Sequence, residues 1–148
     1  MDENRILLAH GGGGSLTREL VEDVIIPLLG GSTDALPDAA AVPGAEDLGF
    51  TTDAFVVKPL FFRGGDIGSL SVHGTVNDLA VSGFEPLALS MSLIVEEGLD
   101  ISILERVVKS AAEAAAACGI RIITGDTKVV RGAKPTNSSS ARQVSVGV

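Results

Sequence analysis

The stretch FFRGGDIGSLSVHGTVNDLAVSG, residues 61–83, dominates the fold that the sequence predicts. Its Gly-Gly pair indicates a turn, and the apolar residues after it recur at helical spacing, which predicts a helix weakened by its glycines. Asn77 and Asp78 stand side by side in this otherwise small and apolar segment. Because a carboxylate among apolar residues is costly unless it is paired, Asp78 must face either water or a partner that needs its charge.

Strand and helix patterns alternate around this segment. Residues 48–57 predict one strand, residues 87–97 a second with apolar residues at alternate positions, and residues 121–126 a third. Between the last two strands, Asp100 is a good N-cap for the clearest helix, which Gly119 ends. This alternation predicts the α/β or α+β class.

The two ends of the chain have weaker patterns. HGGGG, residues 10–14, is a glycine run without fixed structure of its own, and leucine and valine recur at helical spacing across residues 16–28. The segment from Arg131 onward is polar and low in pattern, apart from a possible short strand at its end.

The composition of the chain limits the functions that it can have. The 148 residues suffice for one domain with a sizeable core, and the net charge of -8 argues against non-specific nucleic-acid binding, which needs a basic face. Cys118 is the single cysteine and falls on the apolar stripe of its helix, so we expect a packed thiol and no disulfide or cysteine zinc site. We see no signal peptide and no apolar run long enough to span a membrane, so we expect a cytoplasmic enzyme or part of one.

Four aspartates at loops or strand ends are candidates for chemistry: Asp38, Asp53, Asp78 and Asp126. Converging carboxylates repel one another and need a cation, and oxygen ligands near phosphate suit Mg²⁺. The alternative is that each is a solvated turn residue, since Asp favours turns. Asp53 and Asp78 fit that alternative less well, because their neighbours are apolar.

Phosphate contacts have weaker candidates. The N–H groups of HGGGG can wrap a phosphate, although a flexible arm is the simpler reading, and the lysine-bearing phosphate loop is missing. Asn77 adds a neutral oxygen. Lys128, close to Asp126, forms either a surface ion pair or a phosphate contact.

Taken together, LAHGGGGSLTREL, TTDAFVVKPLFFRGGDIGSLSVHGTVNDLAVSG, EEG and IRIITGDTKVVRGA resemble, in order and spacing, the hydrogenase maturation factor HypE from about Ile6 to Ala133. HypE is grouped with aminoimidazole ribonucleotide synthetase, selenophosphate synthetase and thiamine-monophosphate kinase, whose ATP site uses scattered aspartates and Mg²⁺. The resemblance implies an α+β fold of the aminoimidazole ribonucleotide synthetase type, with a mixed sheet flanked by helices and a barrel formed across a homodimer.

The resemblance also implies roles for particular residues. Asp53, Asp78 and Asp126 are expected to hold Mg²⁺–ATP, and Lys128 to steady the reacting phosphate as a catalytic residue. The remaining expected contacts to the nucleotide are Asp38, Asn77, Gly11, Gly12, Gly13 and Gly14. The implied organisation is a glycine arm and helix over residues 1–35, a family core over residues 36–133 and a divergent tail over residues 134–148, whose last strand is in doubt.

HypE accepts a carbamoyl group on its C-terminal cysteine from the carbamoyltransferase HypF and uses ATP to dehydrate it to a thiocyanate. The cyanide then passes to the HypC–HypD complex for the NiFe hydrogenase centre. Because this chain ends in Val148 without that cysteine or a second domain, we expect it to be inactive alone. One alternative is a dimerisation or docking module with weak or no ATP binding. Another is a small-molecule kinase of the same superfamily, which PLFFRGGDIG and TGDTKVV disfavour.

Overall fold

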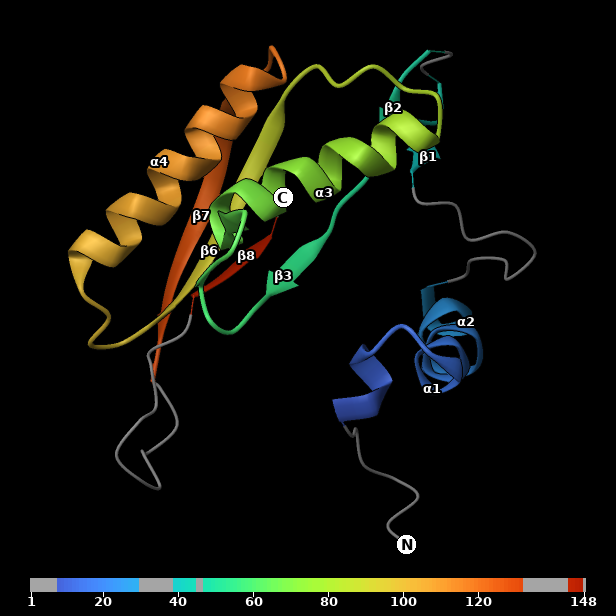
Figure 1. Ribbon diagram of the computed structural model, residues 1–148. Coiled ribbons are helices and arrows are strands. Elements are labelled where there is room, and N and C mark those ends of the chain that lie inside the picture. The colour runs from blue at the N-terminus through green and yellow to red at the C-terminus, as the bar shows by residue number, and fades with distance from the viewer. Residues whose placement is uncertain (1–7, 30–38, 45–46, 132–143, 148) are drawn as a thin grey trace, which may run out of the picture. The chain divides into compact units, whose positions relative to one another are not determined.

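The structure is a computed structural model that describes residues 8–29, 39–44, 47–131 and 144–147 (Figure 1). The chain divides into two compact units, Met1–Pro37 and Asp38–Val148, and each unit is described by itself.

The smaller unit is helical. It contains a 3-10 turn and three consecutive helical segments: η1 Leu8–Gly11, α1 Ser15–Glu19, the π-helical η2 Leu20–Ile25 and α2 Ile26–Leu29. The predicted helix over residues 16–28 is therefore present, although its middle is π-helical. Gly13 has a φ of 75° just before it, a conformation that favours glycine, and its N–H donates to Thr17 Oγ1 at 2.9 Å.

The larger unit combines short strands with two long helices. Its strands are β1 Ala40–Ala41, β2 Gly49–Phe50, β3 Ala54–Val56, β4 Phe61–Phe62, β5 Gly65–Asp66, β6 Leu89–Glu96, β7 Ile122–Val130 and β8 Val144–Gly147. Its helices are α3 Ile67–Val81 and α4 Ile101–Ala117.

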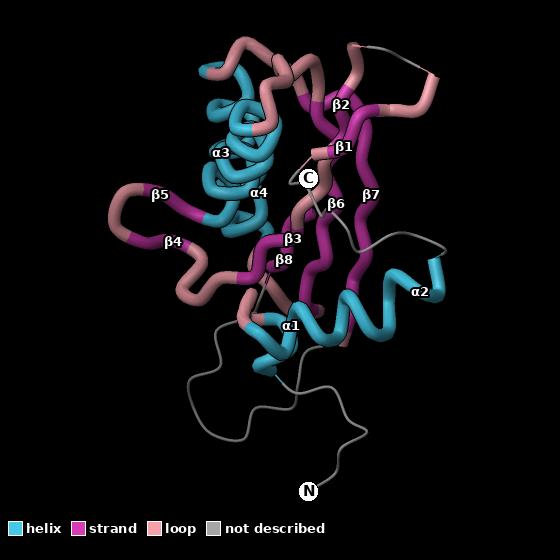
Figure 2. The backbone as a smooth tube through the Cα atoms, turned by 90° about the vertical axis from the view of Figure 1, so that its right-hand side faces the viewer, coloured by secondary structure: helices cyan, strands magenta, loops and turns pink. Residues whose placement is uncertain are grey.

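A four-stranded sheet in the order β3-β8-β6-β7 organises the larger unit. Strands β6 and β7 are parallel, whereas β8 is antiparallel to both β3 and β6, so the sheet is mixed. β1–β2 and β4–β5 form separate two-stranded ribbons. Helices α3 and α4 lie on the same side of the four-stranded sheet (Figure 2), and no other helix is described within the larger unit, so its own helices leave the opposite face uncovered.

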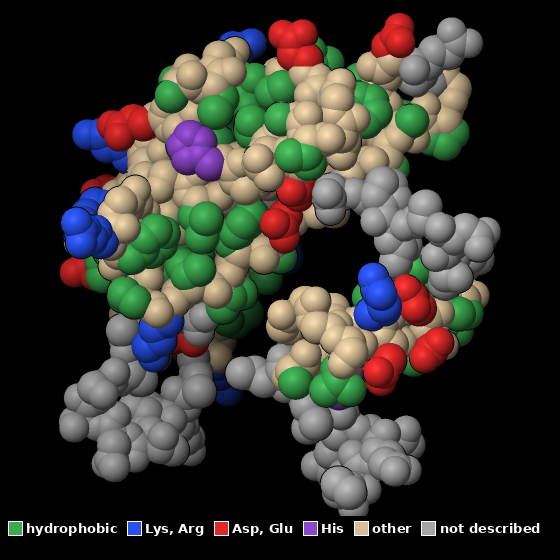
Figure 3. Space-filling model, turned by 45° about the vertical axis from the view of Figure 1, so that its right-hand side comes forward, with side chains coloured by type: hydrophobic (Ala, Val, Ile, Leu, Met, Phe, Trp, Pro, Cys, Tyr) green, Lys and Arg blue, Asp and Glu red, His purple; other side chains and the backbone are tan. Residues whose placement is uncertain are grey.

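The core lies between the two helices and the sheet. Leu89, Met91 and Val95 alternate along β6 with residues that are more exposed, as expected for a sheet with one buried face. Leu89 and Met91 belong to the core cluster, whose other buried members are Ile67, Val72, Val107, Ala111, Ala114, Ala115, Ile120, Val144 and Val146. Outside the core, apolar side chains reach the surface in patches among polar ones (Figure 3).

Helix α3 begins at a capping box. Asp66 Oδ1 accepts hydrogen bonds from the N–H groups of Gly68 at 2.8 Å and Ser69 at 3.0 Å, and Asp66 N–H donates to Ser69 Oγ at 3.1 Å. These bonds satisfy backbone groups that a helix end leaves without partners. They fix where the Gly-Gly turn gives way to the helix that carries Asn77 and Asp78.

The long elements confirm the predicted α+β class. The predicted helix after the Gly-Gly turn is α3, the strand over residues 87–97 is β6, and Asp100 caps α4 with a hydrogen bond from the Ser102 N–H at 2.9 Å. The single strand predicted over residues 48–57 is wrong, because residues 51–53 interrupt it between β2 and β3.

The doubt over the last strand is also wrong. Residues 144–147 lie in the segment predicted as a divergent tail, and they form β8 between β3 and β6, which confirms the short strand predicted at its end. Val144 is 0% exposed and Val146 is 1% exposed, so this strand belongs to the core. In its four residues valine alternates with serine and glycine, a signal that is weak only because it is short.

Candidate functional site

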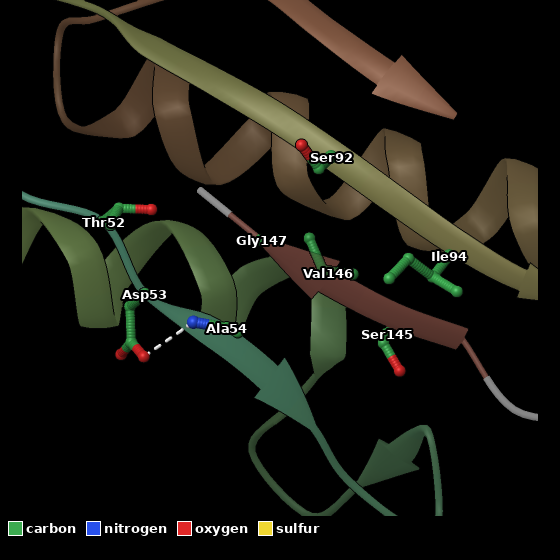
Figure 4. Close-up of a pocket in the computed structure, with 8 residues that line it drawn as sticks. All are labelled: Thr52, Asp53, Ala54, Ser92, Ile94, Ser145, Val146 and Gly147. Atoms are coloured by element: carbon green, nitrogen blue, oxygen red, sulfur yellow. Dashed lines mark hydrogen bonds between the residues drawn. The ribbon is translucent and has the colours of Figure 1, made fainter. Parts of the chain in front are cut away.

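A groove of about 390 Å³ lies on the sheet face that the helices leave uncovered (Figure 4). It is lined by Thr52, Asp53, Ala54, Ser92, Ile94, Ser145, Val146 and Gly147. Its residues come from β6, β8 and the start of β3, so three neighbouring strands build it. The volume is within the range of pockets that hold small ligands, and this groove is the candidate site.

Asp53 is the acidic group at the start of β3. Its Oδ1 accepts a hydrogen bond from the Ala54 N–H at 2.7 Å, the dashed line in Figure 4. The side chain is exposed, so the carboxylate can accept a further cation or donor. The interruption of the strand at residues 51–53 is what places this acid beside the groove instead of within a sheet.

Asp126 and Lys128 form an ion pair on β7. Lys128 Nζ lies 2.9 Å from Asp126 Oδ2 and 3.2 Å from Oδ1, and the Asp126 carboxylate also accepts the Thr127 N–H at 2.9 Å. The Lys128 hydrogen bond, followed by the Thr127 N–H, lowers the pKa of Asp126 below its usual value. Both side chains are more than 60% exposed, at 62% and 68%, so they are accessible to a charged ligand.

The register of the sheet relates this pair to the groove. Ala54 pairs with Gly147, Gly147 pairs with Ser92, and Ser92 pairs with Asp126. Asp126 is therefore in the same row as the groove residues and on the face that they line, with its Cα about 14 Å from that of Ala54 across three strand spacings. Lys128, two residues along β7, shares this face.

The other two predicted acids are Asp78 and Asp38. Asp78 is half-buried on the last turns of α3, in the helical layer, and the neighbouring Asn77 is exposed. Asp38 lies outside the described residues. The structure thus puts Asp126 on the open sheet face, Asp53 beside the groove just before β3, and Asp78 on a helix.

The described residues contain no group of three or more His, Cys, Asp or Glu side chains arranged to hold one metal ion. A single cluster of the predicted acids is therefore not formed in that part of the chain. Mg²⁺ does not require one, because it is usually bound by one or two carboxylates together with water and substrate phosphate. The metal roles of Asp53, Asp78 and Asp126 stay a prediction.

The predicted glycine cover belongs to the smaller unit. Gly11 ends η1, and Gly14 is the residue that precedes α1 in an extended conformation. Gly12 N–H donates to the Ala9 carbonyl at 3.3 Å. The proposed contact of Gly11–Gly14 with phosphate stays a prediction.

Sequence reasoning missed the hydroxyl groups around the groove. Thr52, Ser92 and Ser145 line it, but none of them was singled out as a candidate. A signal was available on β6, where serines alternate with the buried Leu89 and Met91 and therefore occupy the open face. For Ser145 the signal depended on recognising β8.

Three features define the class of this protein. Two helices cover one face of a mixed sheet, a groove bordered by an acid lies on the other face, and the sequence has no lysine-bearing phosphate loop. Residues 36–144 match the model of the family described as AIR synthase related protein, N-terminal domain. The chain belongs to this family.

Within the family, the chain is similar to HypE proteins. It is 53% identical over 137 residues to the carbamoyl dehydratase HypE of Rhodobacter capsulatus, covering 88% of this chain and 40% of that protein. A HypE–HypF complex matches with a TM-score of 0.73 at 41% identity, over 90% of this chain and 40% of the other. A HypE structure in complex with ATP matches with a TM-score of 0.57 at 41% identity, over 97% and 42%.

The resemblance to HypE drawn from the sequence is thereby confirmed, and the chain spans about 40% of the length of the relatives it matches. Among the described residues, no helix has the length and apolar character that crossing a membrane requires.

Proposed function

We propose that this chain is the ATP-binding and dimerising part of a HypE-type carbamoyl dehydratase in hydrogenase maturation. The proposal draws on the similarity to HypE proteins, one of which was solved in complex with ATP. In the whole protein, ATP would drive dehydration of a carbamoylated cysteine to a thiocyanate, the source of the cyanide ligands of the NiFe centre.

The observation that carries the proposal is the open sheet face. The groove beside Asp53 and the Asp126–Lys128 pair occupy one face at one level of the sheet. Lys128 supplies a cationic donor for a phosphate oxygen, and the carboxylates supply oxygens for a cation. This is a donor set for a nucleotide that carries a divalent metal.

The residues present fit Mg²⁺ as a companion of ATP. Asp53 and Asp126 are exposed carboxylates, one beside the groove and one on the open sheet face, and Asp78 is proposed as a third ligand. When bound, Mg²⁺ would neutralise charge that develops on the phosphoryl group. The chain's own part is to orient the triphosphate, with Lys128 on a phosphate oxygen, Asn77 as a neutral contact, and Asp38 and Gly11–Gly14 as further contacts.

Dimerisation belongs to the same proposal. The open face exposes Val56 at 61% and Ile94 at 47%, and among the described strands β3 and β7 are the edges of the sheet. Unpaired edges and exposed apolar side chains favour pairing with another sheet, so we propose a barrel formed with a second copy of this chain. HypF and the HypC–HypD complex are the partners proposed for the whole protein, in the cytoplasm.

Isothermal titration calorimetry of the chain with ATP tests the proposal. We expect binding that requires Mg²⁺ and that weakens at least tenfold in Asp126→Asn, with circular dichroism unchanged. Glu113→Gln is the matched control, because Glu113 also sits in an exposed ion pair, 3.8 Å from Lys109 on α4, but on the helical side of the sheet. ATP affinity equal in the two variants would contradict the role of Asp126.

The open apolar face also supports the second candidate function, a docking module. A dimer by light scattering together with no heat from ATP and Mg²⁺ would favour that module. A monomer at micromolar concentration would contradict the proposed barrel.

A further inference from the structure

A second, smaller cavity lies in the larger unit, away from the groove. It measures about 70 Å³ and is lined by Gly49, Phe50, Thr51, Thr75, Leu79, Ala88, Leu89 and Ser90. It is thus enclosed by β2 and the residue after it, by α3, and by the start of β6. The volume exceeds what one water molecule needs and is well below that of a nucleotide pocket.

The Thr75 hydroxyl is the unexplained group at this cavity. Thr75 is 1% exposed, and its Oγ1 has no hydrogen-bond partner among the described residues. Ser71, one turn earlier on the same helix and 0% exposed, makes the usual local bond, because its Oγ donates to the Gly68 carbonyl at 2.8 Å. Thr75 therefore lacks the side-chain hydrogen bond to the helix backbone that Ser71 makes.

A buried hydroxyl without a partner is destabilising, and folded proteins normally satisfy such groups with protein or with ordered water. The cavity beside Thr75 is roomy enough for water, and a further hydroxyl-bearing residue, Thr51, lines it. A water molecule needs two to four polar partners, and hydroxyl and backbone groups of this lining can supply them.

We propose that Thr75 anchors a buried water molecule in this cavity and that this water joins α3 to the chain at Thr51. Thr75 lies three residues before Asp78, so both are on one side of the helix. Thr51 lies two residues before Asp53. The water thereby fixes the spacing between the two elements that carry these aspartates, and Thr75 is a positioning residue for them. This last step rests on the proposed ATP site.

Two substitutions at Thr75 test the water site. Thr75→Val keeps the shape of the side chain and removes the hydroxyl, whereas Thr75→Ser keeps the hydroxyl. If the hydroxyl binds water, Thr75→Val loses that bond and lowers the melting temperature by roughly 2–4 °C, with Thr75→Ser melting above it. If the hydroxyl is simply unsatisfied, Thr75→Val removes a penalty and raises the melting temperature, which overturns the proposal.

A crystal structure of the unsubstituted chain at high resolution supplies the direct readout. We expect density for a water within hydrogen-bond distance of Thr75 Oγ1 and its loss in Thr75→Val. A cavity without that water, or a Thr75 hydroxyl turned onto the Ser71 carbonyl, overturns the proposal even if a variant fails to fold.

Calorimetry with ATP and Mg²⁺ tests the positioning role separately. We expect roughly tenfold weaker binding in Thr75→Val and recovery in Thr75→Ser, as for groups that orient metal ligands. Unchanged affinity in Thr75→Val removes the positioning role. If the unsubstituted chain binds no ATP, the proposed function and the positioning role fail together, while melting and crystallography still decide the water site.

Discussion

Replacing Gly68 by alanine tests the contact between the two helices. A Cβ added at Gly68 would collide with the Val107 carbonyl oxygen and would lie 3.1 Å from the Ala111 backbone nitrogen. Both atoms belong to the backbone of α4, in a region where Val107 and Ala111 are 0% exposed. The clash can be relieved only by moving one helix away from the other.

The expected cost follows from two opposing effects. Overpacking a filled core costs about 1–3 kcal/mol. Alanine regains at most about 1 kcal/mol of helix propensity relative to glycine, and less here because Gly68 is in the first turn of α3. We therefore expect a net loss of about 1–2 kcal/mol, which for a chain of this size lowers the melting temperature by roughly 5 °C.

Gly74→Ala on the same helix is the matched control, followed by the same thermal and urea unfolding. A Cβ at Gly74 meets the Phe55 ring, with the nearest atom at 2.7 Å, and a half-buried ring can shift where a backbone cannot. The two substitutions change the unfolded chain equally, so their difference reports packing in the folded state together with the smaller gain of helix propensity at Gly68. A Gly68→Ala variant as stable as Gly74→Ala would refute the close helix contact.

Two further predictions concern the sheet. Val146→Ala should lower the free energy of unfolding by about 2 kcal/mol, measured in urea, because Val146 is 1% exposed; a loss below about 0.5 kcal/mol would mean that β8 is not part of the core. In carboxyl NMR, Asp126 should titrate below the usual aspartate pKa, and Lys128→Met should raise it, since Lys128 is the main cause of the lowering. The pair's small stabilising effect is thus present at neutral pH and lost as the pH falls through that lowered pKa; a midpoint that Lys128→Met leaves unchanged would contradict the pairing.

The long elements of the fold were predictable because local physics determines them. The period of α4 and the alternation along β6 follow from which face is buried. The errors concern where strands stop: residues 51–53 interrupt the first predicted strand, and the strand predicted over residues 121–126 continues to Val130, so Asp126 lies within β7 and not at a strand end. The possible short strand at the end of the chain is β8, whose four residues are too few to display a period and which is held by pairing with β3 and β6.

The candidate site was only partly predictable for a related reason. The sequence identified acids beside apolar segments, of which Asp126 lies on the open sheet face and Asp53 borders the groove just before β3. Which face a strand residue occupies was readable, but which strands are neighbours was not, so the row from Ala54 to Asp126 required the register. The position of Asp78 in the helical layer likewise depends on where α3 begins, and the Asp66 capping box sets that point.

The central position of β8 has a consequence for folding kinetics. Within the described residues, β3 joins the four-stranded sheet only through β8, so residues 54–56 cannot pair with the sheet until residues 144–147 have been synthesised and inserted. Pairing between such remote segments makes loop closure costly and folding slow. A nascent chain would expose the edge of β6 during that delay, and this interval is when aggregation or capture by a chaperone would compete with folding.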